Sequence, residues 1–299
     1  IISEIYKKKP DVLAMSCYIW NIEMVKEVCV ELHKLLPNME IWFGGPEVTY
    51  DAKQCLEELP YVKGVMVGEG EETFLELMQY YVEKNKPLAE IRGLVYREEE
   101  IIDTGFRPLL DLSTVPFVYT NMEEFKNKII YYETSRGCPY SCSYCLSSID
   151  KKVRLRDINR VLKELQIFLD YKVPQVKFVD RTFNCNRQHA LAIWRYIKEH
   201  DNGITNFHFE ISADILTEDE LDVLATMRQG LVQLEIGVQS TNEDTIQAIN
   251  RKMNLDKLRA AVDKVNSFGN IHQHLDLIAG LPFEGYESFK KSYDDVYAL

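Results

Sequence analysis

The sequence lacks the features of a membrane protein and of a protein that binds long nucleic acids. No apolar run approaches the roughly 18 residues that a membrane-spanning helix needs, and no signal peptide opens the chain. Its 35 Lys and Arg are outnumbered by 47 Asp and Glu, which gives a formal net charge of −12. Because phosphate binding needs clustered cations, this balance argues against nucleic acid as a partner. The most basic stretch, residues 151–156, is short and typical of the solvated start of a helix.

The sequence also lacks an initiator Met and any low-complexity tract. Residues 1–3, Ile-Ile-Ser, are typical of the middle of a helix, so we expect the true start of the protein to lie upstream. A chain of 299 residues can hold one large α/β domain, or one such domain and a smaller one. Its composition, with 46% hydrophobic and 27% charged residues, is typical of a globular protein.

Cysteine is scarce, with seven in the chain, and a protein of this size does not need disulfides for stability. An odd number of cysteines and no export signal favour free thiols in a reducing compartment, so we expect a cytoplasmic protein. Where cysteines gather closely in such a compartment, metal or redox chemistry is indicated. Cys17, Cys29 and Cys55 instead lie singly in apolar patterns and are interpreted as small core residues.

Strand and helix patterns alternate in two parts of the chain. In the first part, residues 1–86, buried strands are predicted at 11–16, 40–43 and 64–67, with amphipathic helices between and after them. Such alternation indicates a parallel sheet whose ligand crevice lies at the carboxyl ends of the strands. Residues 87–127 show no sustained periodicity beyond a short strand pair and are predicted to form a linker.

The second part, residues 128–299, repeats a strand and a helix five times. The predicted strands are 129–134, 176–179, 207–212, 233–238 and 274–279, and the helices include 158–171, 188–200, 218–228 and 255–268. Successive β/α units indicate a barrel or part of one, with its active site at the carboxyl ends of the strands. We expect at least one more strand in the intact protein.

A tight cysteine motif follows the first strand of this second part. Cys138, Cys142 and Cys145 have the spacing C-x3-C-x2-C. Three thiolates can hold three irons of a [4Fe–4S] cluster and leave the fourth iron open, whereas electron-transfer ferredoxins use four cysteines. From spacing alone, a structural zinc site is the alternative, with Cys185 or a histidine as its fourth ligand.

The motif, with the aromatic Tyr144 before its last cysteine, resembles the signature of the radical S-adenosylmethionine (SAM) superfamily. The resemblance implies a [4Fe–4S] cluster on Cys138, Cys142 and Cys145, with SAM chelated to the open iron and Tyr144 beside the cofactors. It implies one-electron cleavage of SAM to a 5′-deoxyadenosyl radical, and hence an electron donor such as flavodoxin or ferredoxin. The implied fold of this part is a truncated (β/α)6 TIM-like partial barrel.

Polar residues in or just after the later strands are candidates to hold SAM. Glu210 and Asp276 lie within predicted strands, and a carboxylate on an inward-facing strand needs a partner or a ligand. Residues 237–240 (Gly-Val-Gln-Ser), 250–251 (Asn-Arg) and 276–282 (Asp-Leu-Ile-Ala-Gly-Leu-Pro) resemble the oxygen-independent coproporphyrinogen oxidase and methylthiotransferase branch of the superfamily.

This second resemblance implies roles for individual residues. Gln239 and Arg251 would hold the SAM carboxylate, Glu210 its amino group or a nearby polar group, and Asp276 the ribose hydroxyls. Asp180 stands where the family has a glycine-rich motif that contacts the SAM amino group, although no glycine is present here. Asp180 is therefore a candidate SAM contact by position, and the neighbouring Arg181 is an alternative substrate contact.

Glycine-rich strand ends in the first part resemble a cobalamin-binding domain of Rossmann-like fold. Gly44 and Gly45 end the second predicted strand, and Gly68 and Gly70 follow the third. Without Cβ atoms, the backbone can approach a flat corrin ring or its nucleotide tail. By the same resemblance, the hydroxyl of Ser16 would lie against that tail. No D-x-H-x-x-G motif is present, so no histidine ligand to cobalt is predicted, and we expect the domain to be partial, with its first strand upstream.

The two resemblances together predict a cobalamin-dependent radical SAM enzyme. Its most common task would be methyl transfer to an unactivated carbon or phosphorus of a small molecule or peptide. A methylthiotransferase is an alternative that would need a second cluster on Cys17, Cys29 and Cys55. A cobalamin-independent radical SAM oxidoreductase and a non-catalytic zinc-binding scaffold are the further alternatives.

Overall fold

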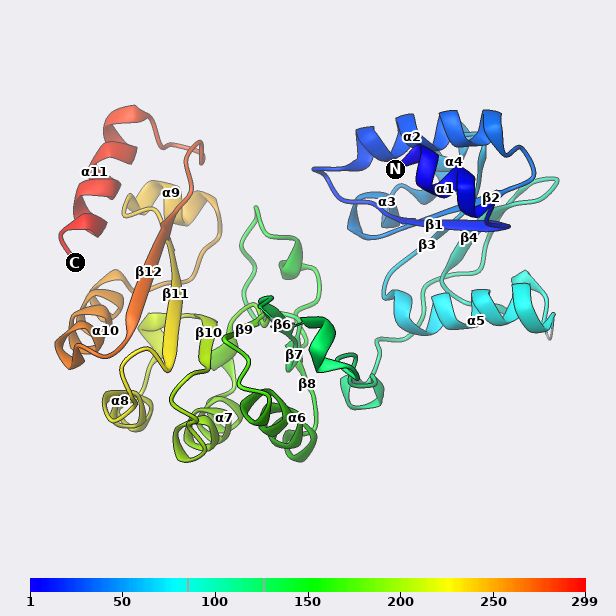
Figure 1. Ribbon diagram of the computed structural model, residues 1–299. Coiled ribbons are helices and arrows are strands. Elements are labelled where there is room, and N and C mark those ends of the chain that lie inside the picture. Colours follow the sequence, from blue (N-terminus) through cyan, green and yellow to red (C-terminus); the bar gives the residue numbers. More distant parts are fainter. Residues whose placement is uncertain (85, 126) are drawn as a thin grey trace. The chain divides into compact units, whose positions relative to one another are not determined.

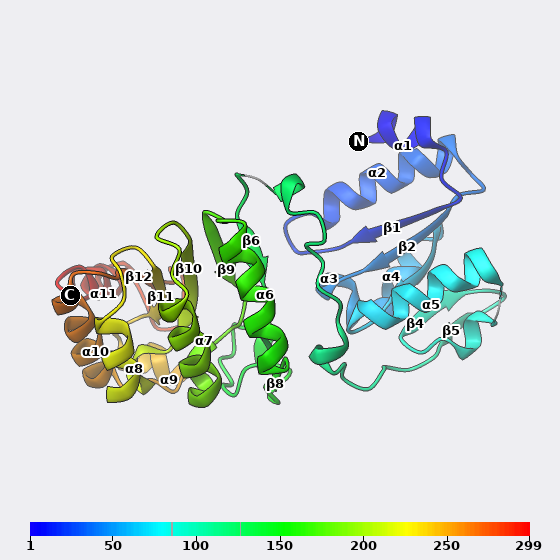
Figure 2. The same cartoon turned by 60° about the horizontal axis from the view of Figure 1, so that its bottom comes forward.

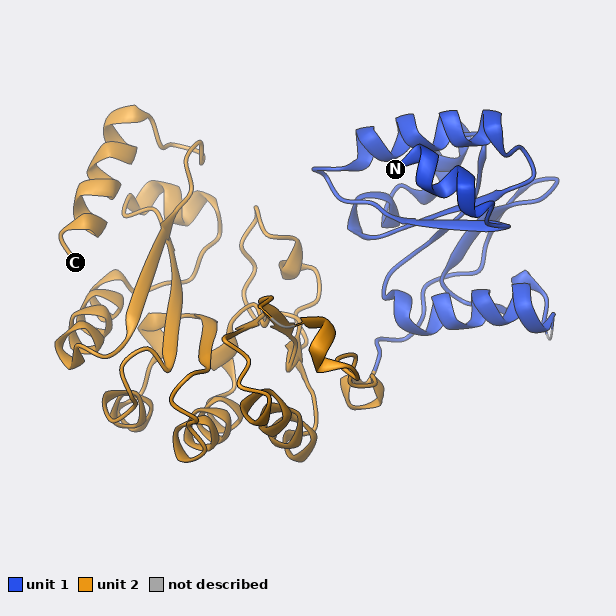
Figure 3. Cartoon of the chain, in the orientation of Figure 1, with its two compact units in different colours: residues 1–110 blue, residues 111–299 orange. Residues whose placement is uncertain are grey.

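A computed structural model describes residues 1–84, 86–125 and 127–299 of the chain. The chain forms two compact units, Ile1–Leu110 and Asp111–Leu299 (Figure 3). Each unit has its own sheet and its own apolar core. Throughout the described residues, no helix combines the length and apolar character needed to cross a membrane.

The first unit is built on a mixed five-stranded sheet. The strand order is β1 (Val12–Ser16), β2 (Glu40–Gly44), β3 (Val62–Met66), β4 (Leu94–Arg97) and β5 (Ile101–Asp103). The first three strands are parallel, as predicted, and β4 and β5 are antiparallel additions. The α-helices described in this unit are α1 (Ile2–Lys8), α2 (Ile22–Leu35), α3 (Pro46–Thr49), α4 (Ala52–Glu58) and α5 (Gly70–Glu83) (Figure 1).

Alternation along β2 explains how this sheet is covered on both faces. Ile41 and Phe43 pack with α2 and α4 on one face, while Trp42 packs with Leu77 of α5 on the other. All three strand residues are fully buried. Successive side chains of a strand point to opposite faces, so a continuous apolar run indicates a strand buried on both sides.

The boundary between the units differs from the predicted one. The sequence predicts a linker over residues 87–127, between domains at 1–86 and 128–299. Residue 85 of the first range and residue 126 of the linker lie outside the described residues. In the structure, Leu94 and Tyr96 of β4 are buried against α5 and belong to the first unit. The second unit begins at Asp111, and its buried Leu112 accepts a hydrogen bond from Arg156 at 2.6 Å. Long-range packing therefore assigns the part of 87–127 up to Leu110 to the first unit and the part from Asp111 to the second. Local periodicity in the sequence does not report such packing.

The second unit is built on a five-stranded parallel sheet in chain order. Its strands are β6 (Ile130–Tyr132), β9 (Gln175–Phe178), β10 (Asn206–Ile211), β11 (Val232–Gln239) and β12 (His272–Leu277). Helices α6 (Ile158–Asp170), α7 (Arg187–Glu199), α8 (Glu218–Ala225) and α10 (Leu255–Phe268) cover its outer side, and α9 (Glu243–Ala248) and α11 (Tyr286–Tyr297) complete the set (Figures 1 and 2). Parallel strands in chain order with helices outside them form a TIM-like partial barrel. The predicted α/β fold, the five strands and the four predicted helices are confirmed.

Alternation along β11 divides this sheet into a core face and a polar face. Its even-numbered residues, 232–238, are buried against the helices, and its odd-numbered residues, 233–239, are half-buried on the inner face. The inner face therefore carries Glu235, Gly237 and Gln239. This face, at the carboxyl end of the strand, is where the motif residues meet.

A short hairpin closes the cysteine loop. Strand β7 (Ser135–Arg136) pairs antiparallel with β8 (Arg154–Leu155). The basic stretch 151–156 is therefore not the solvated start of a helix, because α6 begins only at Ile158. Arg156 is buried and paired with Glu164 at 2.6 Å, and Tyr132 also donates to Glu164 at 2.5 Å. A buried cation held this way anchors the hairpin to α6.

Candidate functional site

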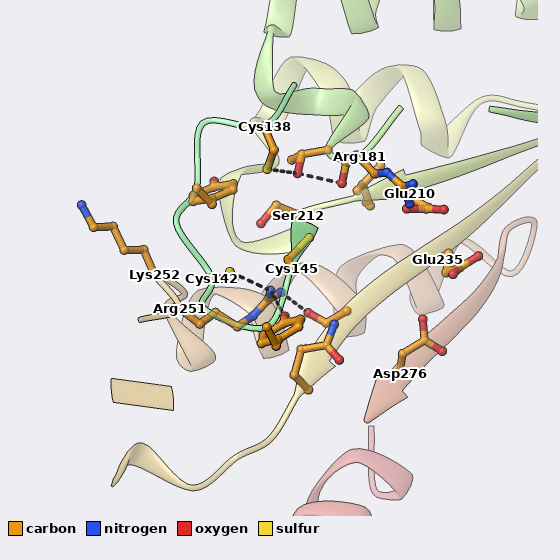
Figure 4. Close-up of a pocket in the computed structure, with 16 residues that line it drawn as sticks. Cys138, Cys142, Cys145, Arg181, Glu210, Ser212, Glu235, Arg251, Lys252 and Asp276 are labelled. Atoms are coloured by element: carbon orange, nitrogen blue, oxygen red, sulfur yellow. Dashed lines mark hydrogen bonds between the residues drawn. The ribbon is translucent and has the colours of Figure 1, made fainter. Parts of the chain in front are cut away.

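A pocket at the carboxyl end of the second sheet gathers most of the predicted cofactor residues. Figure 4 shows side chains from the cysteine loop and from β10, β11 and β12 around it. Eight of the predicted site residues line this one pocket: Cys138, Cys142, Cys145, Tyr144, Glu210, Gln239, Arg251 and Asp276. These residues span more than 130 positions of sequence, and only the partial barrel brings them together.

The cysteine loop presents all three motif thiols to the pocket. Cys138 and Cys142 are 9% and 7% exposed, and Cys145 is half-buried. The Cys138 thiol lies 3.6 Å from the hydroxyl of Thr182, which follows β9. Within the described part of the chain, no three His, Cys, Asp or Glu side chains converge as the ligands of one ion would. Cluster cysteines need not converge in this way, since each binds a different iron.

Gln239 has a strained backbone and a side chain that lacks one partner. Its φ is +71°, in the left-handed region that non-glycine residues seldom adopt, and a β-bulge separates it from Gly237. Its Oε1 is buried without a hydrogen-bond partner among the described residues, as is Nε of Arg251. Buried polar atoms without partners are costly. Two of them at one pocket fit a polar ligand such as SAM.

Gly237 is required for this placement of Gln239. A Cβ atom added at position 237 would lie 2.3 Å from Nε2 of Gln239. The Gly-Val-Gln order therefore has a direct physical basis, because the amide folds back over a residue without a side chain.

We expect Gly237→Ala to weaken SAM binding about tenfold, the effect of losing roughly one hydrogen bond of about 1.4 kcal/mol. The added methyl group must displace the Gln239 amide, while the backbone conformation of residue 237 remains available to alanine. Equilibrium binding of SAM to the reconstituted protein measures the effect. Gly285→Ala is the matched control, because a Cβ there meets no atom within 4 Å. Equal SAM affinity in both variants would contradict this role.

Three carboxylates face the pocket from neighbouring strands. Burial raises the pKa of Glu210, and the adjacent Glu235 charge raises it further. The pKa of Asp276 is raised by partial burial and again by Glu235. Carboxylates of this kind favour a ligand that carries positive charge or several hydrogen-bond donors. The amino group, sulfonium and ribose hydroxyls of SAM meet that requirement.

Glu235 is a pocket residue that the sequence analysis missed. It accepts a hydrogen bond from Lys177 at 2.9 Å, and His208 Nε2 lies at the same distance. Burial alone would raise its pKa, but the hydrogen bond and charge of Lys177 hold that pKa below its ordinary value. The signal was available, since Glu235 shares the alternation of Gly237 and Gln239 along one strand.

Arg251 lies in the pocket with its terminal nitrogens engaged by the protein. Nη1 is 3.9 Å from the sulfur of Cys142 and donates to the hydroxyl of Tyr144 at 3.2 Å. Nη2 donates to the carbonyl of Gly237. Burial raises the pKa of Tyr144 to about 12, so its hydroxyl stays protonated. The predicted contact of Arg251 with a SAM carboxylate stays a prediction.

Asp180 corrects one prediction. It is fully buried and absent from the pocket wall, and its carboxylate accepts hydrogen bonds from the backbone N–H and hydroxyl of Thr134. His189 lies 3.1 Å from the same hydroxyl. Burial raises the pKa of Asp180 to about 7 and lowers that of His189 to about 4. Asp180 therefore supports the strand before the cysteine loop, and Arg181, the next residue, reaches the pocket instead.

The predicted cobalamin residues lie at or beside the carboxyl ends of β1–β3. Ser16 is exposed at the end of β1, and Gly44 ends β2. Gly45 has a φ of +96°, and a Cβ there would lie 2.6 Å from the carbonyl oxygen of Cys17. Its lack of a side chain is thus explained by the approach of the β1 loop. Gly68 and Gly70 are exposed after β3, with open space around Gly70.

An aromatic pair beside Ser16 was missed. Tyr18 and Trp20 stack with ring centroids 4.5 Å apart, and Trp20 is 77% exposed. Asn21 holds this loop, because its amide donates to the Ser16 carbonyl at 3.0 Å and accepts from the Tyr18 N–H at 2.7 Å. The loop therefore presents two aromatic rings at the predicted ligand edge of this sheet.

Comparison with known families and curated proteins supports the same division of the chain. The Radical SAM superfamily model matches residues 132–296, and the B12 binding domain model matches residues 1–78. The chain is 29% identical over 305 residues to the cobalamin-dependent radical SAM methyltransferase TokK of Streptomyces tokunonensis. That match covers 94% of this chain and 44% of the relative, so the chain spans less than half of that protein's length.

Two solved structures share the fold of both units. TsrM from Kitasatospora setae, with cobalamin and a [4Fe–4S] cluster bound, gives a TM-score of 0.77 at 16% identity, covering 99% of this chain and 61% of that one. OxsB with aqua-cobalamin and S-adenosylmethionine bound gives a TM-score of 0.77 at 20% identity, covering 98% of this chain and 44% of that one. The two family models confirm the predicted cofactors: the radical SAM superfamily model supports the [4Fe–4S] cluster and SAM, and the B12 binding domain model supports cobalamin. The chain belongs to the radical SAM superfamily and carries a B12-binding domain in its first unit.

Proposed function

We propose that the protein is a cobalamin-dependent radical SAM methyltransferase that acts on an unactivated centre. The observation that carries the proposal is the joining, in one chain, of a B12-binding domain and a pocket with three cysteines and three carboxylates. The relative TokK bears the name of that activity. When bound, the cluster and SAM supply one-electron cleavage of SAM and hydrogen abstraction, and methylcobalamin supplies the methyl group.

In this proposal the residues of the chain bind and orient the cofactors. Cys138, Cys142 and Cys145 hold the cluster, and Gln239 contributes the unpartnered Oε1 as an acceptor for a donor group of SAM such as its amino group. This differs from the carboxylate contact that the resemblance implies for Gln239, because a carboxylate only accepts hydrogen bonds. Glu210 and Asp276 accept hydrogen bonds from the SAM amino group and ribose. Their raised pKa values fit this arrangement, because a donor ligand would stabilise the charged carboxylates.

The substrate side of the pocket is assigned to Arg181. This exposed side chain lines the pocket, and within the described residues it makes no side-chain hydrogen bond or salt bridge, although its charge acts on Glu210 of the same pocket. We infer that it is available to an anionic or polar group of a small-molecule or peptide substrate. An electron donor such as flavodoxin or ferredoxin would reduce the cluster, and a cytoplasmic location fits the free thiols of the chain.

The methylthiotransferase alternative is disfavoured by the first unit. Cys17 and Cys29 are fully buried, and burial raises the pKa of these thiols to about 11 and about 12. Burial raises the pKa of the Cys55 thiol as well. Protonated thiols packed in an apolar core are poor ligands for a second cluster. A zinc-binding scaffold does not fit a member of this superfamily.

The test is anaerobic reconstitution followed by iron, sulfide and cobalt counts and turnover with methyl-labelled SAM. We expect cobalamin uptake, quenching of the emission of the exposed Trp20, and passage of the label to cobalamin and then to product. The chain has three tryptophans, and Trp42 and Trp194 are fully buried. The part of the emission that comes from a solvent-exposed tryptophan is therefore that of Trp20. No cobalamin uptake would refute the proposal. SAM cleavage without labelled cobalamin would instead indicate a cobalamin-assisted oxidation or rearrangement.

A further inference from the structure

The segment after α9 fastens the cysteine loop by three separate contacts. The backbone N–H of Ser143 donates to the Ile249 carbonyl at 2.9 Å. The Asn250 side chain donates to the Ser141 carbonyl, also at 2.9 Å. Arg251 then reaches the sulfur of Cys142 from Nη1 at 3.9 Å. Ser141, Cys142 and Ser143 are thus each held by a residue of the segment 249–251, more than 100 positions away in sequence.

The geometry of Asn250 and Arg251 suits this task. Asn250 adopts a left-handed φ of +52°, a conformation that asparagine tolerates better than most residues, and it follows the end of α9. The turn directs Arg251 back toward the strand, where Nη2 donates to the Gly237 carbonyl. The guanidinium therefore bridges the cysteine loop and β11, with Nη1 aimed at sulfur.

We propose that Arg251 is a positioning residue for the cluster that raises its reduction potential through an N–H···S hydrogen bond to Cys142. This inference rests on the assignment of the cluster to Cys138, Cys142 and Cys145. Reduction adds one electron from the external donor and makes the cluster and its thiolates more negative. A cation that donates to a cluster sulfur stabilises the reduced state more than the oxidised one, so the potential rises.

This role differs from the SAM-carboxylate contact that the family resemblance implies for Arg251. A residue that acts on Cys142 affects the cluster before SAM is added. A residue that acts only on the SAM carboxylate leaves the potential of the SAM-free cluster unchanged and weakens SAM binding alone. Its two Nη atoms already contact Cys142, Tyr144 and Gly237, which supports the first role, and only Nε, which has no partner among the described residues, is left for a ligand.

The experiment compares Arg251→Gln with Lys252→Gln in the anaerobically reconstituted protein without SAM. Both variants remove one positive charge from the wall of the same pocket, but only Arg251 contacts a cluster cysteine. The midpoint potential is measured by a redox titration followed by electron paramagnetic resonance. We expect Arg251→Gln to lower the ratio of reduced to oxidised cluster at a fixed potential by about tenfold, which is about 59 mV for one electron. Lys252→Gln is expected to change this ratio much less.

Arg251→Lys keeps the charge but loses the planar fork, so a smaller shift in the same direction is expected. If Arg251→Gln assembles no cluster, the potential of Arg251→Lys carries the measurement. A potential within error of the Lys252→Gln value in both Arg251 variants would overturn the proposal. Failure of the wild-type protein to assemble a cluster would instead overturn the cluster assignment, and absence of methyl transfer would leave the potential measurement intact.

Discussion

Replacing Cys142 with alanine is expected to abolish assembly of the cluster, with iron and sulfide contents falling to background. Cys142 is 7% exposed and lines the pocket, and the loop from residue 138 to residue 145 carries no cysteine outside the motif. The same result is expected for Cys138→Ala and Cys145→Ala, because the cluster needs all three thiolates for three of its irons. The absorbance of the reconstituted protein and its iron and sulfide counts provide the measurement.

Cys185→Ala is the matched control for this experiment. Cys185 lies in the same unit, and the Cys138 charge acts on its thiol, yet it does not line the pocket. Burial raises the pKa of Cys185 to about 11, which disfavours the thiolate that a metal would need. We therefore expect Cys185→Ala to keep its iron content. Full iron content and SAM cleavage in Cys142→Ala, or loss of iron in Cys185→Ala alone, would refute the assignment of ligands.

The second large effect is expected on SAM affinity. Gln239→Ala and Asp276→Ala should each weaken SAM binding ten- to about a hundredfold, while the iron content stays unchanged. A hydrogen bond to a charged group contributes about 1.5–3 kcal/mol, which corresponds to that range of affinity. The unpartnered Oε1 of Gln239 and the raised pKa of Asp276 both indicate groups that need a ligand.

Asp263→Ala serves as the control, because Asp263 is exposed on α10 and outside the pocket. It removes the same charge as Asp276→Ala, so it reports any general effect of protein charge on SAM binding. Equilibrium binding to the reconstituted protein gives the three affinities. If Gln239→Ala and Asp276→Ala bound SAM as tightly as Asp263→Ala does, the two side chains would not contact SAM and their role would be structural only.

The sequence by itself determined the features that depend on residues close together along the chain, namely the cysteine motif and the strand and helix patterns. The cysteine motif is a single short loop, so its spacing identifies three thiolates on one turn before any fold is known. The five strands and the helices of the second unit follow from alternation and 3.6-residue periodicity, which are local patterns of burial. For the same reason Gln239 and Asp276 were found, since each stands in or at the end of a strand pattern that leads to the pocket.

Only the tertiary structure decided which polar side chains reach the pocket and what they contact there. Asp180 shares the alternation of the buried Val176 and Phe178 and lies in the core, whereas Glu210 alternates with the buried Phe209 and Ile211 and faces the pocket. The hydrogen bonds from Thr134 that hold Asp180 in the core join residues 46 positions apart, so no local pattern reports them. Arg251 carries no local sign that it reaches Cys142, because this contact joins residues 109 positions apart. Burial and hydrogen-bond partners are properties of the packed chain, and local sequence periodicity reports neither.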